Sequence, residues 1–172
     1  MTEINRINIE TPLGLMYACA TDRGVCLLEF YDRKKIDTQF ESLKKHLAIN
    51  ILENETPILK NLKIELLEYF AGKRQNFSVP LHLVGGDFQK KVWNELLKIP
   101  FGKTVSYKQL AENVGNSKAV RAVANANAAN KIAVIVPCHR VIGSNGSLTG
   151  YAGGLDRKLN LLKLEGKDNG LF

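Results

Sequence analysis

A change of pattern at Gly85-Gly86 constrains the fold of this chain more than any other feature. Before the two glycines, short apolar runs alternate with turn residues, which is typical of β-strands. After them, apolar residues recur every three or four positions, which is typical of amphipathic helices. Paired glycines favour a turn or linker. The sequence therefore predicts two domains, residues 1–86 and 87–172, and 172 residues are enough for two small cores.

The first half predicts a small α/β unit. Thr56-Pro57 has the form of a helix N-cap followed by proline at the first helical position, and helical spacing of apolar residues continues to Gly72. Residues 34–48 are compatible with a shorter helix. The remaining apolar runs predict strands at residues 4–9, 15–20, 25–30 and 77–83, with a hairpin turn at residues 21–24.

The second half predicts three short helices, the last two arranged as a helix-turn-helix through Gly115-Asn116. The third helix, about residues 118–129, places four alanines on one side, which suits either close approach to another surface or tight core packing. Arg121 lies beside this alanine side. The predicted N-caps are Asp87, Ser106 (with Gln109 three residues later, as in a capping box) and Ser117, and the alanines are Ala119, Ala122, Ala126 and Ala129.

The positive charge is confined to the second half. Residues 1–86 hold 11 Lys and Arg against 11 Asp and Glu, whereas residues 87–172 hold 13 against 6. A neutral half joined to a basic half indicates that the second half meets a polyanion such as nucleic acid. The alternative is a charge that serves only solubility.

Composition narrows the cellular setting. No apolar run approaches the roughly 20 residues needed to span a bilayer, and the N-terminus lacks the pattern of a signal peptide. Three cysteines are an odd number and a poor basis for disulfides. We therefore expect a cytoplasmic protein that does not bind membranes and keeps its thiols reduced.

A reactive site is indicated where the apolar run Ile132–Val136 ends in Pro137-Cys138-His139-Arg140. The run predicts a buried strand, and polar residues often form sites at the end of such strands. A base and a cation beside a cysteine raise its thiolate fraction and make it a nucleophile. Neighbouring strand residues point to opposite faces, so direct contact between Cys138 and His139 does not follow. A purely structural Cys-His pair is the alternative.

The string from Ile135 to Ile142 resembles the active-site signature of the O6-alkylguanine-DNA alkyltransferases, also called methylated-DNA–protein-cysteine S-methyltransferases. The resemblance covers about residues 87–167 closely, whereas residues 1–86 match only in layout. It implies a ribonuclease-H-like α/β domain followed by a winged helix-turn-helix-like domain. The supporting segments are Phe101-Gly102, Val105-Ser106-Tyr107, Gly115-Asn116, Ala119–Val123, Asn130, Tyr151–Leu155, Leu161-Leu162 and Glu165-Gly166.

The resemblance also implies a mechanism. The alkylated guanine is flipped out of double-stranded DNA, and its alkyl group passes irreversibly to Cys138 in a single turnover. His139 takes the thiol proton through water, Glu165 orients His139, and Asn130 braces the turn of the site.

Further residues are implied to hold the DNA. The recognition helix lies in the minor groove, where Arg121 fills the vacated base stack and Tyr107 rotates the flanking phosphate. Tyr151 and the backbone near Val141 and Ala152 bind the guanine edge. Position 152 is alanine where some members have serine, which removes one possible contact to the base.

Two other functions are compatible with the same residues. A winged-helix DNA binder or a lesion sensor without chemistry is one, although such sensors replace the reactive cysteine. A cysteine hydrolase that uses Cys138 and His139 is another. We expect a monomer without a cofactor. We also expect no metal site, because Cys19, Cys26, His46 and His82 lack a recognisable ligand spacing. The largest alkyl group accepted and activity on O4-alkylthymine stay undecided.

Overall fold

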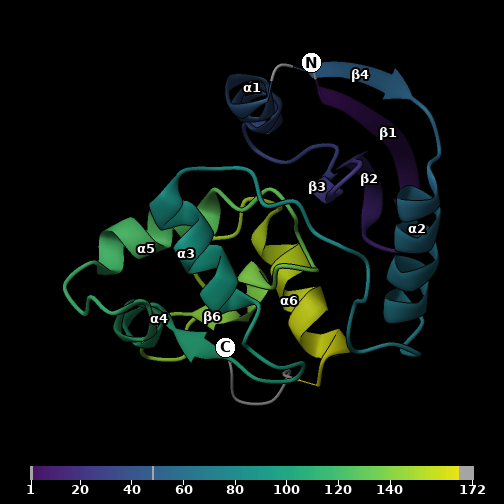
Figure 1. Ribbon diagram of the computed structural model, residues 1–172. Helices are drawn as coiled ribbons and strands as arrows, with labels where there is room; N and C mark the ends of the chain where they lie inside the picture. Colours follow the sequence, from purple (N-terminus) through teal and green to yellow (C-terminus); the bar gives the residue numbers. More distant parts are fainter. Residues whose placement is uncertain (1, 48, 167–172) are drawn as a thin grey trace. The chain divides into compact units, whose positions relative to one another are not determined.

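The computed structural model describes residues 2–47 and 49–166, and the chain divides into two compact units, residues 1–85 and 86–172 (Figure 1). The first unit contains a sheet and two helices, and the second is mainly helical. This arrangement confirms the predicted α/β class with a sheet domain followed by a helical domain. None of the described helices is both long and apolar enough to cross a membrane.

The first unit is built on a four-stranded sheet in the order β3-β2-β1-β4. Neighbouring strands are antiparallel, except that β4 runs parallel to β1. Helix α2 packs against β1, β2 and β3, and Figure 1 shows α1 and α2 on either side of the sheet. The elements are β1 (Thr2–Thr11), β2 (Gly14–Thr21), β3 (Gly24–Phe30), α1 (Ile36–His46), β4 (Ile49–Glu53) and α2 (Pro57–Phe70).

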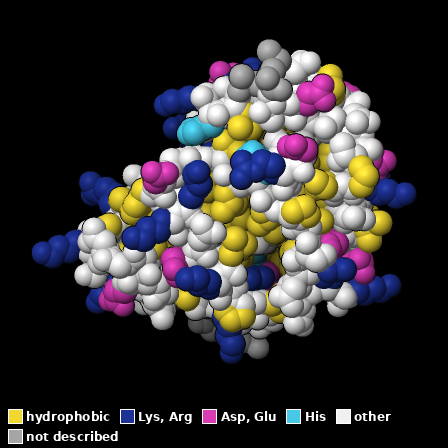
Figure 2. Space-filling view, viewed as in Figure 1, with side chains coloured by type: hydrophobic (Ala, Val, Ile, Leu, Met, Phe, Trp, Pro, Cys, Tyr) yellow, Lys and Arg dark blue, Asp and Glu magenta, His cyan; other side chains and the backbone are white. Residues whose placement is uncertain are grey.

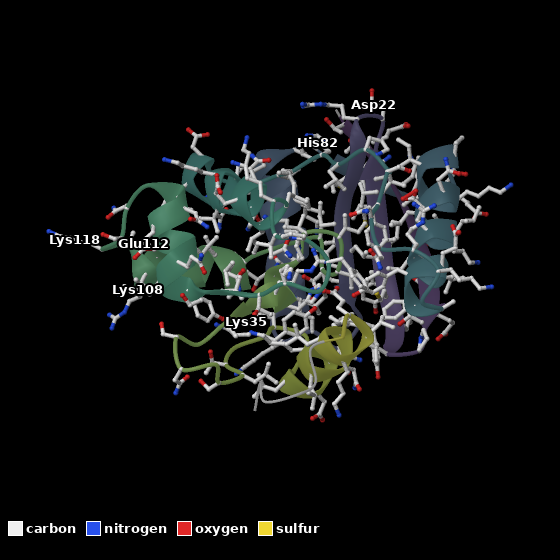
Figure 3. All side chains as sticks on the ribbon, turned by 90° about the horizontal axis from the view of Figure 1, so that it is seen from below. Asp22, Lys35, His82, Lys108, Glu112 and Lys118 are labelled. Carbon is white, nitrogen blue, oxygen red and sulfur yellow. The ribbon has the colours of Figure 1, made fainter. Side chains whose placement is uncertain are left out.

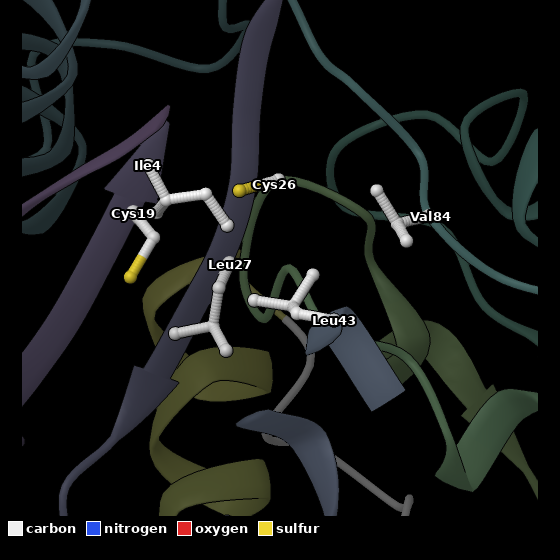
Figure 4. Packing of buried hydrophobic residues seen from close by; sticks show 6 residues of the cluster. All are labelled: Ile4, Cys19, Cys26, Leu27, Leu43 and Val84. Carbon is white, nitrogen blue, oxygen red and sulfur yellow. The ribbon is translucent and has the colours of Figure 1, made fainter. Parts of the chain in front are cut away.

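Buried apolar side chains hold this unit together. Leu43 of α1 packs against Ile4, Cys19 and Leu27 of the sheet (Figure 4). At the start of α2, the Thr56 side chain accepts a hydrogen bond from the Leu59 backbone N–H, as the predicted cap requires. Both the helix cap and the hairpin between β2 and β3 are therefore confirmed.

The predicted strand at residues 77–83 is wrong. This segment forms only an isolated bridge between Leu81 and Val25 of β3, with the Pro80 carbonyl accepting from Val25 N at 2.9 Å and His82 N donating to Val25 O at 2.8 Å. Proline has no N–H to donate, so the pairing cannot extend through residue 80.

The described part of the second unit contains four α-helices, one turn of 3-10 helix and a short two-stranded ladder. In Ser106, at the start of α4, the hydroxyl accepts from Gln109 N at 3.0 Å, and Gly115 ends the same helix at a φ of 99°, a left-handed conformation that glycine adopts without strain. The predicted N-cap at Ser106 and the predicted helix end at Gly115 are therefore confirmed. The elements are α3 (Asp87–Leu96), β5 (Val105–Ser106), α4 (Tyr107–Val114), α5 (Val120–Ala128), η1 (Cys138–Arg140), β6 (Val141–Ile142) and α6 (Leu155–Leu164).

Two predicted caps in this unit are wrong. Gly86 is the N-cap of α3, so Asp87 is the first residue inside the helix. Its negative charge there interacts favourably with the positive end of the helix dipole. Helix α5 begins at Val120 after Ala119 instead of after Ser117. The Asn116 side chain accepts from Lys118 N at 3.2 Å, and this local turn delays the helix.

Candidate active site

The segment before Cys138 is a buried turn, so the strand predicted for Ile132–Val136 is wrong. Ile135 N donates to Ala133 O at 2.8 Å and Val136 N donates to Ile132 O at 3.0 Å. Val134 has a φ of 71°, which is unusual for a β-branched residue. An uninterrupted apolar run fits a buried turn as well as a buried strand, so periodicity could not separate the two.

Asn130 holds this turn to the cysteine that follows it. Its Oδ1 accepts from Ile132 N at 3.0 Å, and its Nδ2 donates to Val136 O at 2.9 Å. The same Nδ2 lies 3.2 Å from Cys138 Sγ. An amide donor beside the sulfur favours the thiolate form.

Cys138, His139 and Arg140 form one turn of 3-10 helix, η1. The sulfur-bearing Cys138 is 7 % exposed, whereas Cys19 and Cys26 are fully buried. His139 Nε2 lies 2.8 Å from Glu165 Oε2, with both side chains buried. His139 Nδ1 has no hydrogen-bond partner among the described residues. The resemblance implied this pairing of His139 with Glu165, and the structure brings the two together.

The cation next in sequence turns away from the cysteine. Arg140 donates from Nε to Glu165 Oε1 at 2.8 Å and from Nη2 to Glu165 Oε2 at 3.1 Å. Its Nη1 donates to Ile99 O at 2.6 Å, at the end of the α3 region. The charge of Arg140 is therefore compensated by Glu165, so Arg140 is not the uncompensated cation that the sequence led us to expect beside Cys138.

Burial and hydrogen bonding fix the charge states of this cluster. Burial lowers the pKa of His139 against the opposing effect of Glu165, so the ring is neutral near pH 7. Burial alone would raise the pKa of Glu165, but hydrogen bonds from His139 and Arg140 and the positive charge of Arg140 lower it well below its usual range. A neutral imidazole bonded to a carboxylate donates through Nε2, which leaves the lone pair on Nδ1.

Lys158 is a site residue that sequence reasoning missed. It is fully buried in α6, and its ammonium donates to the carbonyl oxygens of Val141 (2.6 Å), Thr149 (2.7 Å) and Gly150 (3.1 Å). Burial lowers the pKa of Lys158 to about 8. A signal was present in the sequence, because Lys158 precedes Leu161 and Leu162 by three and four residues and so shares the apolar face of α6.

The predicted guanine-binding residues are Val141, whose carbonyl Lys158 holds, and Tyr151 and Ala152, which follow Gly150 in the chain. Val141 is buried in β6, whereas Tyr151 and Ala152 are half-buried in the loop that leads to α6. Tyr107, the first residue of α4, is half-buried, and its hydroxyl donates to Thr149 O at 3.3 Å. Tyr107 therefore contacts the loop that carries Tyr151.

Helix α5 presents a narrow exposed face. Arg121, Ala122, Asn125 and Ala128 are exposed, whereas Ala126 is buried. The four predicted alanines consequently do not share one open side, since Ala126 packs inward. Asn127 is also buried, and its Nδ2 lies 3.5 Å from Cys138 O. The helix thus exposes Arg121 on one face and approaches Cys138 with the other.

Basic side chains surround the same part of the unit. Lys108 of α4 and Lys118, in the turn before α5, are exposed along with Arg121. Figure 2 shows Lys and Arg side chains projecting on the left, where Figure 1 draws α4 and α5. Lys108, Glu112 and Lys118 lie together at this outer edge in Figure 3. The surface beside Arg121 is suited to a polyanion.

Two family models together match most of the chain. One, described as "6-O-methylguanine DNA methyltransferase, DNA binding domain", matches residues 87–167. The other, "6-O-methylguanine DNA methyltransferase, ribonuclease-like domain", matches residues 6–83. These descriptions agree with the fold predicted for each half.

Full-length relatives agree with the family models. A methylated-DNA–protein-cysteine methyltransferase of Methanosarcina acetivorans is 46 % identical over 157 residues, which cover 91 % of this chain and 95 % of the relative. The inducible enzyme of the same name from Bacillus subtilis is 42 % identical over 87 % of this chain and 83 % of its own. A crystal structure of Mycobacterium tuberculosis OGT in complex with DNA has a TM-score of 0.79 at 37 % identity, covering 95 % of this chain and 92 % of that one.

Proposed function

Because the chain belongs to the 6-O-methylguanine DNA methyltransferase family, we propose that it repairs DNA by transferring the alkyl group of an O6-alkylguanine to its own Cys138. The observation that carries the proposal is the buried cluster of Cys138, His139 and Glu165, in which the histidine is neutral with its Nδ1 lone pair unused. A thiol needs such a base to become a nucleophile.

The chemistry follows from the charge states. The Cys138 proton passes through a water to His139 Nδ1, and the imidazolium is stabilised by Glu165, which Arg140 holds ionised. The thiolate attacks the alkyl carbon, so an S–C bond forms while the bond from carbon to O6 breaks. The electron pair of that bond stays with guanine, which takes up a proton. The thioether has no leaving group, so each molecule reacts once.

Access to the base requires flipping, since O6 is stacked inside the duplex. Helix α5 enters the minor groove with Arg121, Ala122 and Asn125 on its exposed face, and Arg121 occupies the space that the base leaves. Tyr107 acts on the flanking phosphate. Tyr151 and the backbone near Val141 and Ala152 hold the guanine edge.

The two halves have separate duties in this proposal. Residues 87–172 bind DNA and accept the alkyl group, and residues 1–86 support them. In this proposal the protein acts as a monomer.

A stoichiometric count tests the function. The protein is incubated with excess duplex containing one O6-methylguanine, and its mass is followed with time. We expect a gain of one methyl group per protein, mapped to the Cys138 peptide, and no gain in Cys138→Ala. Repeated turnover without a mass gain would instead identify a hydrolase, and binding without transfer would identify a lesion sensor.

A further inference from the structure

Lys158 is the buried cation of the site that no carboxylate compensates. Its side chain is fully buried, and among residues 2–47 and 49–166 no Asp or Glu forms an ion pair with it. Glu165, the acid at the end of the same helix, is already bonded to His139 and Arg140. Burying an ammonium without a compensating negative charge costs free energy, even where carbonyl oxygens accept its protons.

The three hydrogen bonds of Lys158 join two separate pieces of backbone. Val141 O belongs to β6, directly after the Cys138–Arg140 turn, whereas Thr149 O and Gly150 O belong to the loop that precedes Tyr151. Tyr107 also donates to Thr149 O. The ammonium therefore fastens both ends of the loop over residues 143–150 to each other and to α6.

The same charge acts on the nucleophile. The groups that face Lys158 electrostatically are Tyr107 from α4 and Cys138 and His139 from η1. His139 is neutral, Tyr107 keeps its proton because burial raises its pKa, and Arg140 is matched by Glu165. Ionised Cys138 raises the pKa of Lys158 against the effect of burial, so the two charges stabilise each other.

We propose that Lys158 is a positioning residue of the alkyl-transfer site, whose ammonium ties the 143–150 loop to β6 and supplies the positive charge that favours the thiolate of Cys138. The inference rests on the proposed function in taking Cys138 as the alkyl acceptor. Its test uses no DNA and no alkylguanine, so the two can fail separately.

The thiolate role is tested by the pH profile of Cys138 alkylation with iodoacetamide, read by peptide mass between pH 5.5 and 9. In Lys158→Gln and Lys158→Met, we expect the midpoint to rise by about one pH unit, as loss of an adjacent opposite charge does. One unit lowers the thiolate fraction about tenfold, and the more basic sulfur recovers about threefold in intrinsic reactivity. The rate at pH 6.5 should therefore fall about threefold.

Three comparisons separate charge from structure. Lys158→Arg keeps the charge and should keep the wild-type midpoint, and Lys163→Met removes an exposed lysine of the same helix and should change nothing. The loop role is read from hydrogen exchange of the Gly143 amide, which donates to Ser147 O within the loop. Exchange should speed up more in Lys158→Met than in Lys158→Gln, which retains a donor. A purely structural role would alter exchange but not the midpoint.

Unchanged midpoints in folded Lys158→Gln and Lys158→Met would overturn the proposal. If both variants unfold, the wild-type protein supplies the answer. The pKa of Lys158, about 8 in the free protein, is measured by lysine NMR before and after Cys138 is capped with iodoacetamide. Capping removes the thiolate, so the pKa should fall; an equal pKa in both forms would refute the charge coupling.

Discussion

Replacing Glu165 by glutamine should separate alkyl transfer from DNA binding. The carboxylate is fully buried and accepts from His139 Nε2 at 2.8 Å, from Arg140 Nε at 2.8 Å and from Arg140 Nη2 at 3.1 Å. The side chain is buried inside the unit, so it cannot reach a phosphate. Glu165→Gln keeps the shape of the side chain and removes its charge.

Two magnitudes follow from this geometry. Removing one partner of a buried ion pair costs about 3–5 kcal/mol, and we expect about 3 kcal/mol because glutamine keeps one oxygen acceptor. The glutamine NH₂ can also face His139 Nε2, which forces the ring proton onto Nδ1 and removes the lone pair that accepts the thiol proton. A general base contributes about 10²–10⁴-fold, and we expect a loss of about 100-fold because a thiol is already a fair acid.

The assay is single-turnover methyl transfer from a duplex, run beside equilibrium DNA binding and urea unfolding. Transfer should slow about 100-fold while the dissociation constant for undamaged DNA changes less than about twofold. Glu10→Gln, at an exposed acid of β1 outside the proposed DNA-binding unit, is the control and should retain wild-type stability. Weakened DNA binding together with a normal rate of transfer would refute the assignment of Glu165 to the proton relay.

Two further perturbations probe other parts of the molecule. Arg121→Ala should slow repair of a duplex about tenfold, because its contact would offset about 1.4 kcal/mol of the cost of flipping, and should hardly slow repair of a short single strand. Arg121→Lys should behave like Arg121→Ala on the duplex. Equal slowing on both substrates would contradict the flipping role. Burial raises the pKa of Cys19 to about 12, so wild type should lose stability as pH rises above about 8.5 toward 12, and Cys19→Ala should lose less over the same range in urea unfolding.

Local signals in the sequence predicted the caps at Thr56 and Ser106 but not those of α3 and α5. The caps at Thr56 and Ser106 are hydrogen bonds over three residues, so a short string of sequence contains both partners. Strand β4 was not predicted, because its pairing partner β1 lies more than forty residues earlier and its own residues alternate poorly. The turn at Ile132–Val136 was mistaken for a strand, since burial explains its composition whatever its backbone does.

Resemblance predicted the residues of the candidate site, but not its electrostatics. His139 and Glu165 were expected to pair and do so. Sequence adjacency made Arg140 the expected cation of Cys138, and the structure turns it toward Glu165, 25 residues later. The lysine that takes its place, Lys158, is brought to the site by α6 and by carbonyl groups that carry no sequence signature.

The charges of the cluster suggest where this lysine matters most in the proposed reaction. Glu165 and Arg140 compensate each other and His139 is neutral, so Lys158 leaves a net positive charge that one thiolate balances. During transfer, the negative charge moves from sulfur to the departing guanine, which occupies the same site. A cation that stabilises both the thiolate and the departing guanine lowers the barrier only by the difference between the two stabilisation energies. Lys158 should therefore raise the thiolate population at neutral pH more than the intrinsic rate, and its variants should approach the wild-type rate of methyl transfer as the pH rises above both midpoints.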